Sequence, residues 1–171
     1  MDLGDLVITL HGDVIETPVN AENVAGLLPG RGDLADEYIV VGAHLDHLGM
    51  GDFGSREGPG KLHPGADDNA SGSAAVLLIA ESMVDAYEGL DEEAPARSVL
   101  FIGFSAEESG LNGSRYYADN PIAPIEDHVL MTNFDMIGRI NDRLSVAGMS
   151  TGEGMEEWIE PFVEECELDV V

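Results

Sequence analysis

The stretch "EYIVVGAHLDHLG", residues 37 to 49, joins an apolar run to a group of polar side chains. The run before His44 is typical of a central strand that is covered on both faces. His44 and Asp46 share one face of the chain, because residues i and i+2 of a strand point the same way. A lone histidine after a strand is usually a satisfied polar side chain. Here Asp46 can instead orient the imidazole, as carboxylates do beside metal-bound histidines.

Apolar runs and helical patterns alternate along the rest of the chain. An extended segment with a turn inside it is predicted at 6–17. Two strands joined by a polar loop are predicted within 23–44. Further strands are predicted at 97–105, 128–138 and 143–148. Helices are predicted at 69–89, 110–121 and 152–166, where Pro161 would interrupt the last one, and a long glycine-rich loop at 48–66. This alternation predicts an α/β fold, a three-layer α/β/α sandwich with a mostly parallel mixed sheet.

The composition favours one acidic domain. The chain has 171 residues with 44% hydrophobic content, and 7 Lys+Arg oppose 34 Asp+Glu for a net charge of -27. This charge disfavours nucleic acid and anionic membrane surfaces as partners, and it attracts metal ions and amine-bearing substrates. No apolar stretch approaches the roughly 20 residues of a membrane-spanning helix. The single cysteine, Cys166, excludes an internal disulfide.

Metal-ligand side chains follow each predicted buried strand. They are His44 after the first strand, Glu107 and Glu108 after the second, Asp135 after the third, and Asp67 and Asp68 where the glycine-rich loop meets a helix. Ligands of α/β folds bind beyond the carboxyl ends of strands. A carboxylate next to an apolar run is costly without a partner, and a bound cation removes that cost. Carboxylates with a histidine nitrogen suit zinc, and also manganese or cobalt.

Glu107 and Glu108 are adjacent, so their side chains point in different directions and cannot have the same role. One can bind metal while the other handles a proton, which is the division that metal-assisted hydrolysis needs. A bridging carboxylate can also hold two metals roughly 3.5–4 Å apart. Asp67 and Asn69 could instead simply cap the N-terminus of the following helix, because Asp and Asn are preferred at that position.

Four segments together resemble the consecutive motifs of the M28 family of zinc aminopeptidases. They are "GAHLDHLG" (42–49), "GADDNASGSAAVLLIAE" (65–81), "FIGFSAEESGLNGS" (101–114) and "NFDMIGR" (133–139). The resemblance covers most of the chain, from about Asn23 to Arg139, and implies a zinc exopeptidase fold over residues 1–171.

The resemblance also implies a role for each site residue. His44 and Asp135 would be terminal ligands of one zinc, Asp68 would bridge two zincs, Glu108 would be the carboxylate ligand of the second, Glu107 would be the general base, and Asp46 would orient His44. The peptide bond between Asp68 and Asn69 is expected to be cis.

The family pattern includes a last histidine ligand on the second zinc, well after the position of Asp135. No histidine follows His128 in this chain. We therefore expect a partial catalytic domain that alone binds zinc weakly, loses the second ion first, has little or no activity and self-associates through uncovered surface. His47 and His63 are interpreted as surface residues, although either can line the substrate cleft. If two zincs bind tightly, these two are the candidates for the absent ligand.

The function that the resemblance implies is hydrolysis of peptide bonds at a free N-terminus by a two-zinc site. A carboxypeptidase or a glutaminyl cyclase on the same scaffold stays open, as does a non-catalytic binding module. The cyclase uses one zinc, and the full set of bridging and terminal ligands favours two. Related enzymes are often secreted or periplasmic, but the acidic N-terminus has no signal peptide, so the compartment stays open.

Overall fold

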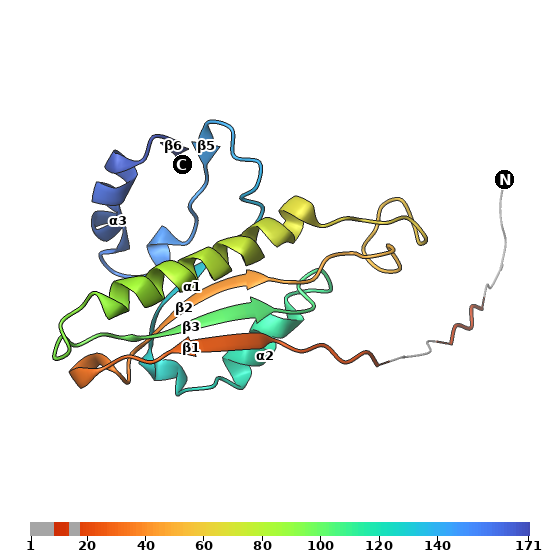
Figure 1. Ribbon diagram of the computed structural model, residues 1–171. Coiled ribbons are helices and arrows are strands. Elements are labelled where there is room, and N and C mark those ends of the chain that lie inside the picture. Colours follow the sequence, from red (N-terminus) through yellow and green to blue (C-terminus); the bar gives the residue numbers. More distant parts are fainter. Residues whose placement is uncertain (1–8, 14–17) are drawn as a thin grey trace.

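The computed structural model of the protein describes residues 9–13 and 18–171 (Figure 1). The predicted extended segment at 6–17 falls mostly outside the described residues, and residues 9–13 have no regular structure.

A four-stranded mixed sheet forms the centre of the fold. Its strand order is β1 (Val24–Leu28), β3 (Ser98–Phe104), β2 (Tyr38–His44) and β4 (His128–Asn133). β2 is parallel to both β3 and β4, while β1 is antiparallel to β3. The structure thus confirms the strands predicted within 23–44, 97–105 and 128–138, and the mostly parallel sheet.

Helices and short elements complete the chain. They are η1 (Gly32–Leu34), η2 (Ala66–Ser71), α1 (Gly72–Glu88), α2 (Asn112–Asp119), η3 (Ile125–Asp127), β5 (Arg143–Leu144), η4 (Met149–Thr151), α3 (Met155–Glu165) and β6 (Asp169–Val170). The three predicted helices are confirmed. The predicted strand at 143–148 shrinks to the two residues of β5, which pair with β6.

The prediction that Pro161 interrupts the last helix is wrong, because α3 continues through it. Proline lacks the N–H that would bond the carbonyl four residues earlier. That carbonyl belongs to Glu157, an exposed residue, so water can donate to it instead.

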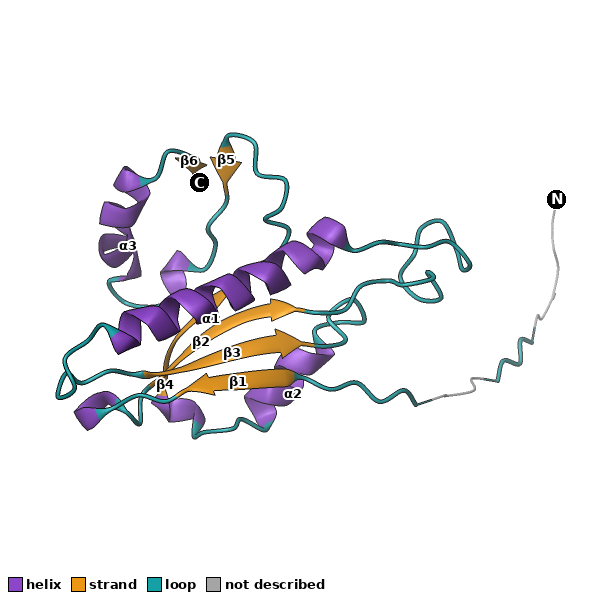
Figure 2. Cartoon of the chain, viewed as in Figure 1, coloured by secondary structure: helices purple, strands orange, loops and turns teal. Residues whose placement is uncertain are grey.

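Two apolar clusters lie on opposite faces of the sheet. One joins Val40, Leu100, Ile102 and Phe104 to Tyr117 of α2. The other joins Val41, Ala43 and Val99 to Val76 of α1. Neighbouring strand residues divide between the clusters because successive side chains point to opposite faces. Figure 2 shows the resulting layers, with α1 over one face of the sheet and α2 over the other. The predicted three-layer α/β/α arrangement is confirmed.

Parallel pairing brings the carboxyl ends of β2, β3 and β4 to one edge of the sheet. Figure 1 shows the ends of β2 and β3 side by side there. His44 is the last residue of β2, and the loops after β3 and β4 carry the predicted acids. The start of α1 lies at the same edge. Within the described part of the chain, no helix has the length and apolar character needed to cross a membrane.

Substitution of a buried leucine should lower the free energy of unfolding far more than substitution of an exposed one. Leu100 is 1% exposed and Leu77 of α1 is 72% exposed. Leu100→Ala should lower the free energy of unfolding by about 2–5 kcal/mol, because it removes packed methyl groups and leaves a cavity. Leu77→Ala should change it by no more than about 0.5 kcal/mol. Urea denaturation followed by circular dichroism measures both, and equal losses would contradict the assignment of the core.

Candidate metal centre

His44 is fixed at the end of β2 with one ring nitrogen free to bind. The residue is 3% exposed. Its Nδ1 lies 3.0 Å from the main-chain oxygen of Asp46. A carbonyl oxygen only accepts, so Nδ1 carries the proton and Nε2 presents its lone pair. This is the tautomer that a metal-ligating histidine needs.

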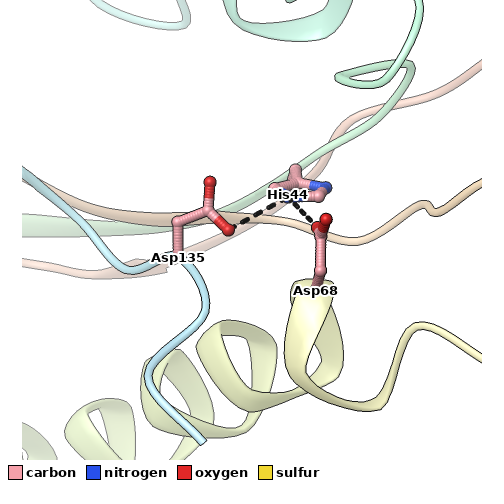
Figure 3. Close-up of side chains that lie close together, drawn as sticks. All are labelled: His44, Asp68 and Asp135. Carbon is pink, nitrogen blue, oxygen red and sulfur yellow. Dashed lines mark ion pairs between the residues drawn. The ribbon is translucent and has the colours of Figure 1, made fainter. Parts of the chain in front are cut away.

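The free nitrogen of His44 faces two carboxylates (Figure 3). Nε2 lies 3.1 Å from Asp68 Oδ1 and 3.4 Å from Asp135 Oδ1. Ligands held at 2.0–2.1 Å in tetrahedral geometry are about 3.3 Å from one another. The separations therefore fit three ligands around one zinc-sized ion.

A second group of ligand atoms consists of His47, Asp68 and Glu108. His47 Nδ1 lies 2.5 Å from Glu108 Oε1 and 3.7 Å from Asp68 Oδ1. In each group the ligand atoms lie within 4.8 Å of one another. Asp68 belongs to both groups, and its Oδ1 lies within 3.7 Å of a ring nitrogen of each imidazole.

The side chain of Asn69 ties Asp68 to Asp135. Asn69 is 2% exposed, and its peptide bond with Asp68 is cis, as the sequence resemblance implies. Its Nδ2 donates to the Phe134 carbonyl at 2.9 Å. Its Oδ1 accepts from the N–H groups of Gly72 at 3.0 Å and Met136 at 3.3 Å. These bonds join the start of α1 to the residues on either side of Asp135.

Asp67 does not face the metal-ligand atoms. Its carboxylate accepts from the Gly138 N–H at 2.8 Å and from Arg139 Nε at 2.7 Å. The hydrogen bond from Arg139 is the main cause that lowers the pKa of Asp67 below its ordinary value. Asp67 therefore anchors the loop after Asp135. Of the two proposed caps, Asn69 is the one that bonds the Gly72 N–H at the start of α1.

The comparisons with known proteins identify the family of the chain. The model described as "Peptidase family M28" matches residues 23–170. The chain belongs to peptidase family M28. An "Aminopeptidase" of Pseudomonas aeruginosa is 35% identical over 139 residues, which cover 80% of this chain and 22% of that protein.

Two further relatives have related names. A "Probable leucine aminopeptidase" of Arthroderma otae is 29% identical over 124 residues, 72% of this chain and 32% of that protein. A "Leupeptin-inactivating enzyme 1" of Streptomyces exfoliatus is 38% identical over 107 residues, 62% of this chain and 20% of that protein. The chain thus spans between a fifth and about a third of the length of these curated relatives.

Peptidases of family M28 depend on metal ions, and the charges at this site fit such a group. Carboxylates outnumber histidines here: the acids are Asp46, Asp68, Glu107, Glu108 and Asp135. In the described part of the chain, their ion-pair partners are His44 and His47, and no lysine or arginine pairs with them. Crowded carboxylates repel one another, so divalent cations would stabilise the arrangement.

Asp46 contacts both His44 and Glu107. Its carboxylate Oδ1 is 3.8 Å from His44 Nδ1, and its main-chain oxygen makes the hydrogen bond to that ring. The carboxylate instead accepts the Glu107 N–H at 3.1 Å. Asp46 therefore positions both residues, His44 by its backbone and Glu107 by its side chain.

Glu107 lies beside the first group without belonging to it. Its Oε2 is 4.0 Å from His44 Nε2. Burial raises the pKa of Glu107 above its ordinary value, and Glu108, Asp135 and Asp46 add to the rise, while His44 opposes it. A carboxylate with a raised pKa accepts a proton from water more readily.

Of the two positions that sequence reasoning left open for His47, it favoured the surface, whereas the structure places His47 in the lining of a cavity. In the structure its side chain is 21% exposed and touches Glu108. The available signal was the spacing "HLDH", which puts a second imidazole three residues beyond His44. His63 stays outside both groups and bonds Ser55 Oγ through Nε2 at 2.9 Å. His128 bonds the Tyr117 hydroxyl, which agrees with a structural role.

Removal of the Asn69 hydrogen bonds should lower the free energy of unfolding. Asn69→Ala leaves the Phe134 carbonyl and two N–H groups without this partner at a buried position. We expect a loss of about 1–3 kcal/mol in the free energy of unfolding. Asn141→Ala, at an exposed residue, should change it by no more than about 0.5 kcal/mol. Chemical denaturation measures both, and an Asn69→Ala protein as stable as the control would refute the role of this side chain.

Proposed function

We propose that these residues form the two-zinc centre of an aminopeptidase. The observation that carries the proposal is the shared position of Asp68, which belongs both to the group with His44 and Asp135 and to the group with His47 and Glu108. Two-metal hydrolases place their ions about 3.5–4 Å apart across such a bridge. The activity belongs to the complete protein that contains these residues.

Bound zinc would supply Lewis-acid chemistry, polarising the scissile carbonyl and making water more acidic. The chain itself supplies the proton transfers. Glu107 takes a proton from the attacking water and passes it to the leaving amine, and its raised pKa suits both steps. Asp46 holds the Glu107 backbone at 3.1 Å, which keeps the base directed toward the site.

The surroundings of the site suit a peptide with a free amino terminus. A cavity of about 580 Å³ adjoins the second group and is lined partly by Asp46, His47 and Glu108. Its acidic side attracts a protonated α-amino group. Val19, Leu48 and Phe53 also line it and offer an apolar surface to a substrate side chain. Several relatives carry the name leucine aminopeptidase, which fits an apolar first residue.

The alternatives fit less well. A carboxypeptidase must bind the terminal carboxylate of its substrate, for which arginine is the usual partner. Among the described residues, the lining of this cavity includes no arginine or lysine. A cyclase with one metal would leave the second group of ligands without a purpose. A non-catalytic module would need neither group.

Two substitutions test the proposed general base, Glu107, separately from the proposed bridging ligand, Asp68. In the complete gene product that contains these residues, Glu107→Gln should lower kcat for an amino-acid anilide by about 10²–10⁴-fold and leave zinc content unchanged, because it removes only the base. Asp68→Asn should lose zinc as well as activity, because both ions share that side chain. Zinc is measured by atomic emission beside the assay.

Matched controls lie on the exposed face of α1. Glu88→Gln and Asp85→Asn remove charges of the same kind far from the strand ends, and should leave both activity and zinc content unchanged. Equal zinc loss in Glu107→Gln and Asp68→Asn would contradict the division of roles. An active Glu107→Gln protein would refute the proposed base.

A further inference from the structure

We infer that Ser55 is a positioning residue for the selection of the substrate's first residue. The inference rests on the proposed aminopeptidase and concerns the glycine-rich loop at 48–64, which forms one wall of the cavity beside the metal centre. Leu48 and Phe53 are the apolar side chains that this loop contributes to the cavity. The hydrogen bond between Ser55 and His63 holds that wall in place.

The loop is folded back on itself by hydrogen bonds of its own backbone. The Gly60 N–H donates to the Met50 carbonyl at 2.7 Å, and the His63 N–H donates to the Gly49 carbonyl at 2.8 Å. These two bonds join the outgoing half of the loop to the returning half. A loop that is ordered before the substrate arrives loses little freedom on binding, so its side chains can act as a fixed surface.

Two glycines allow a tight turn around Phe53. A Cβ added at Gly54 would lie 2.9 Å from Leu48 Cδ2, so Leu48 packs against the backbone that follows Phe53. A Cβ added at Gly51 would lie 2.9 Å from the Ser55 Cβ, so Ser55 packs against the backbone that precedes Phe53. Gly54 and Gly51 have φ angles of +73° and +74°, which favour glycine. The backbone is therefore held on both sides of Phe53.

Ser55 connects this turn to the metal centre. Its Oγ lies 2.9 Å from His63 Nε2 and also accepts the Glu57 N–H at 3.1 Å. The His63 ring in turn meets the His47 ring edge-on, with 6.2 Å between the ring centroids. His47 belongs to the second group of ligand atoms. The bond between Ser55 and His63 therefore links the turn that carries Phe53 to the place where the substrate reacts.

Phe53 presents an apolar ring to the cavity. It is 64% exposed, although the backbone on both sides of it is held by the contacts above. A first residue with an apolar side chain would cover part of this ring, and removal of that surface from water would favour binding. A first residue without a side chain would gain nothing from the wall. An aromatic ring that merely lies at the surface is the competing explanation, and it predicts no dependence on the substrate.

Kinetics of the complete gene product with two anilide substrates distinguish these explanations. Ser55→Ala should raise KM for leucine p-nitroanilide about 10-fold, the lower end of what one methylene group is worth in an apolar pocket. It should leave kcat unchanged, because the wall contributes binding and takes no part in the chemistry. Both constants for glycine p-nitroanilide should stay unchanged, which also shows that the variant is folded.

Two further variants complete the experiment. Phe53→Ala tests the wall itself with the hydrogen bond left in place, and it should raise KM for the leucine substrate by a similar factor without affecting the glycine substrate. Lys61→Gln is the matched control, because it removes only an exposed ion pair with Glu57, at 2.9 Å, in the same loop. It should change neither substrate.

The glycine substrate separates a role in selection from a role in stability alone. An unchanged KM for leucine p-nitroanilide in Ser55→Ala or Phe53→Ala would overturn this inference and leave the proposed aminopeptidase intact. Equal losses on both substrates would also overturn it, since they would give the hydrogen bond a structural role only. A wild-type protein that hydrolyses neither anilide would overturn the proposed function and this inference together.

Discussion

The hydrogen bonds of one buried amide, Asn69, hold the metal centre together. Asp68 comes from the start of α1 and Asp135 from the loop after β4, so the ligands reach the site on separate elements. Asn69 connects these elements through the Phe134 carbonyl and the N–H groups of Gly72 and Met136. A side chain at Gly72 would collide with Asn69 and with that carbonyl, so the close approach of helix and strand depends on glycine here.

The pairing of the parallel strands and the hydrogen bonds of Asn69 each position part of the site. Pairing of β2 with β3 and β4 aligns the strand ends and determines which residues are available. The Asn69 hydrogen bonds then hold Asp68 and Asp135, whose oxygens lie 3.1 and 3.4 Å from His44 Nε2, within a few tenths of an ångström of tetrahedral spacing.

Much of this was predictable from sequence. Long apolar runs that end in His44, Glu107 and Asp135 predict parallel strands and a common edge, and both follow from periodicity and the geometry of sheets. The spacing in "HLDH" was a sequence signal for His47, but the contact of its ring with Glu108 also depends on how a glycine-rich loop returns at Gly65, which the sequence does not give. The contact between the Asp46 carboxylate and the Glu107 N–H was also hidden, since sequence alone does not show that the backbone and side chain of Asp46 contact different partners. The helical path through Pro161 depends on the exposure of α3, which composition alone does not give.

In the proposed centre, Asp68 lies between two metal ions. A crystal structure of the zinc-loaded chain, with anomalous diffraction recorded at the zinc absorption edge, tests this arrangement. We expect two anomalous peaks about 3.5–4 Å apart, one beside His44 and Asp135 and one beside His47 and Glu108, with the Asp68 carboxylate between them. A single peak, or peaks that do not contact Asp68, would contradict it.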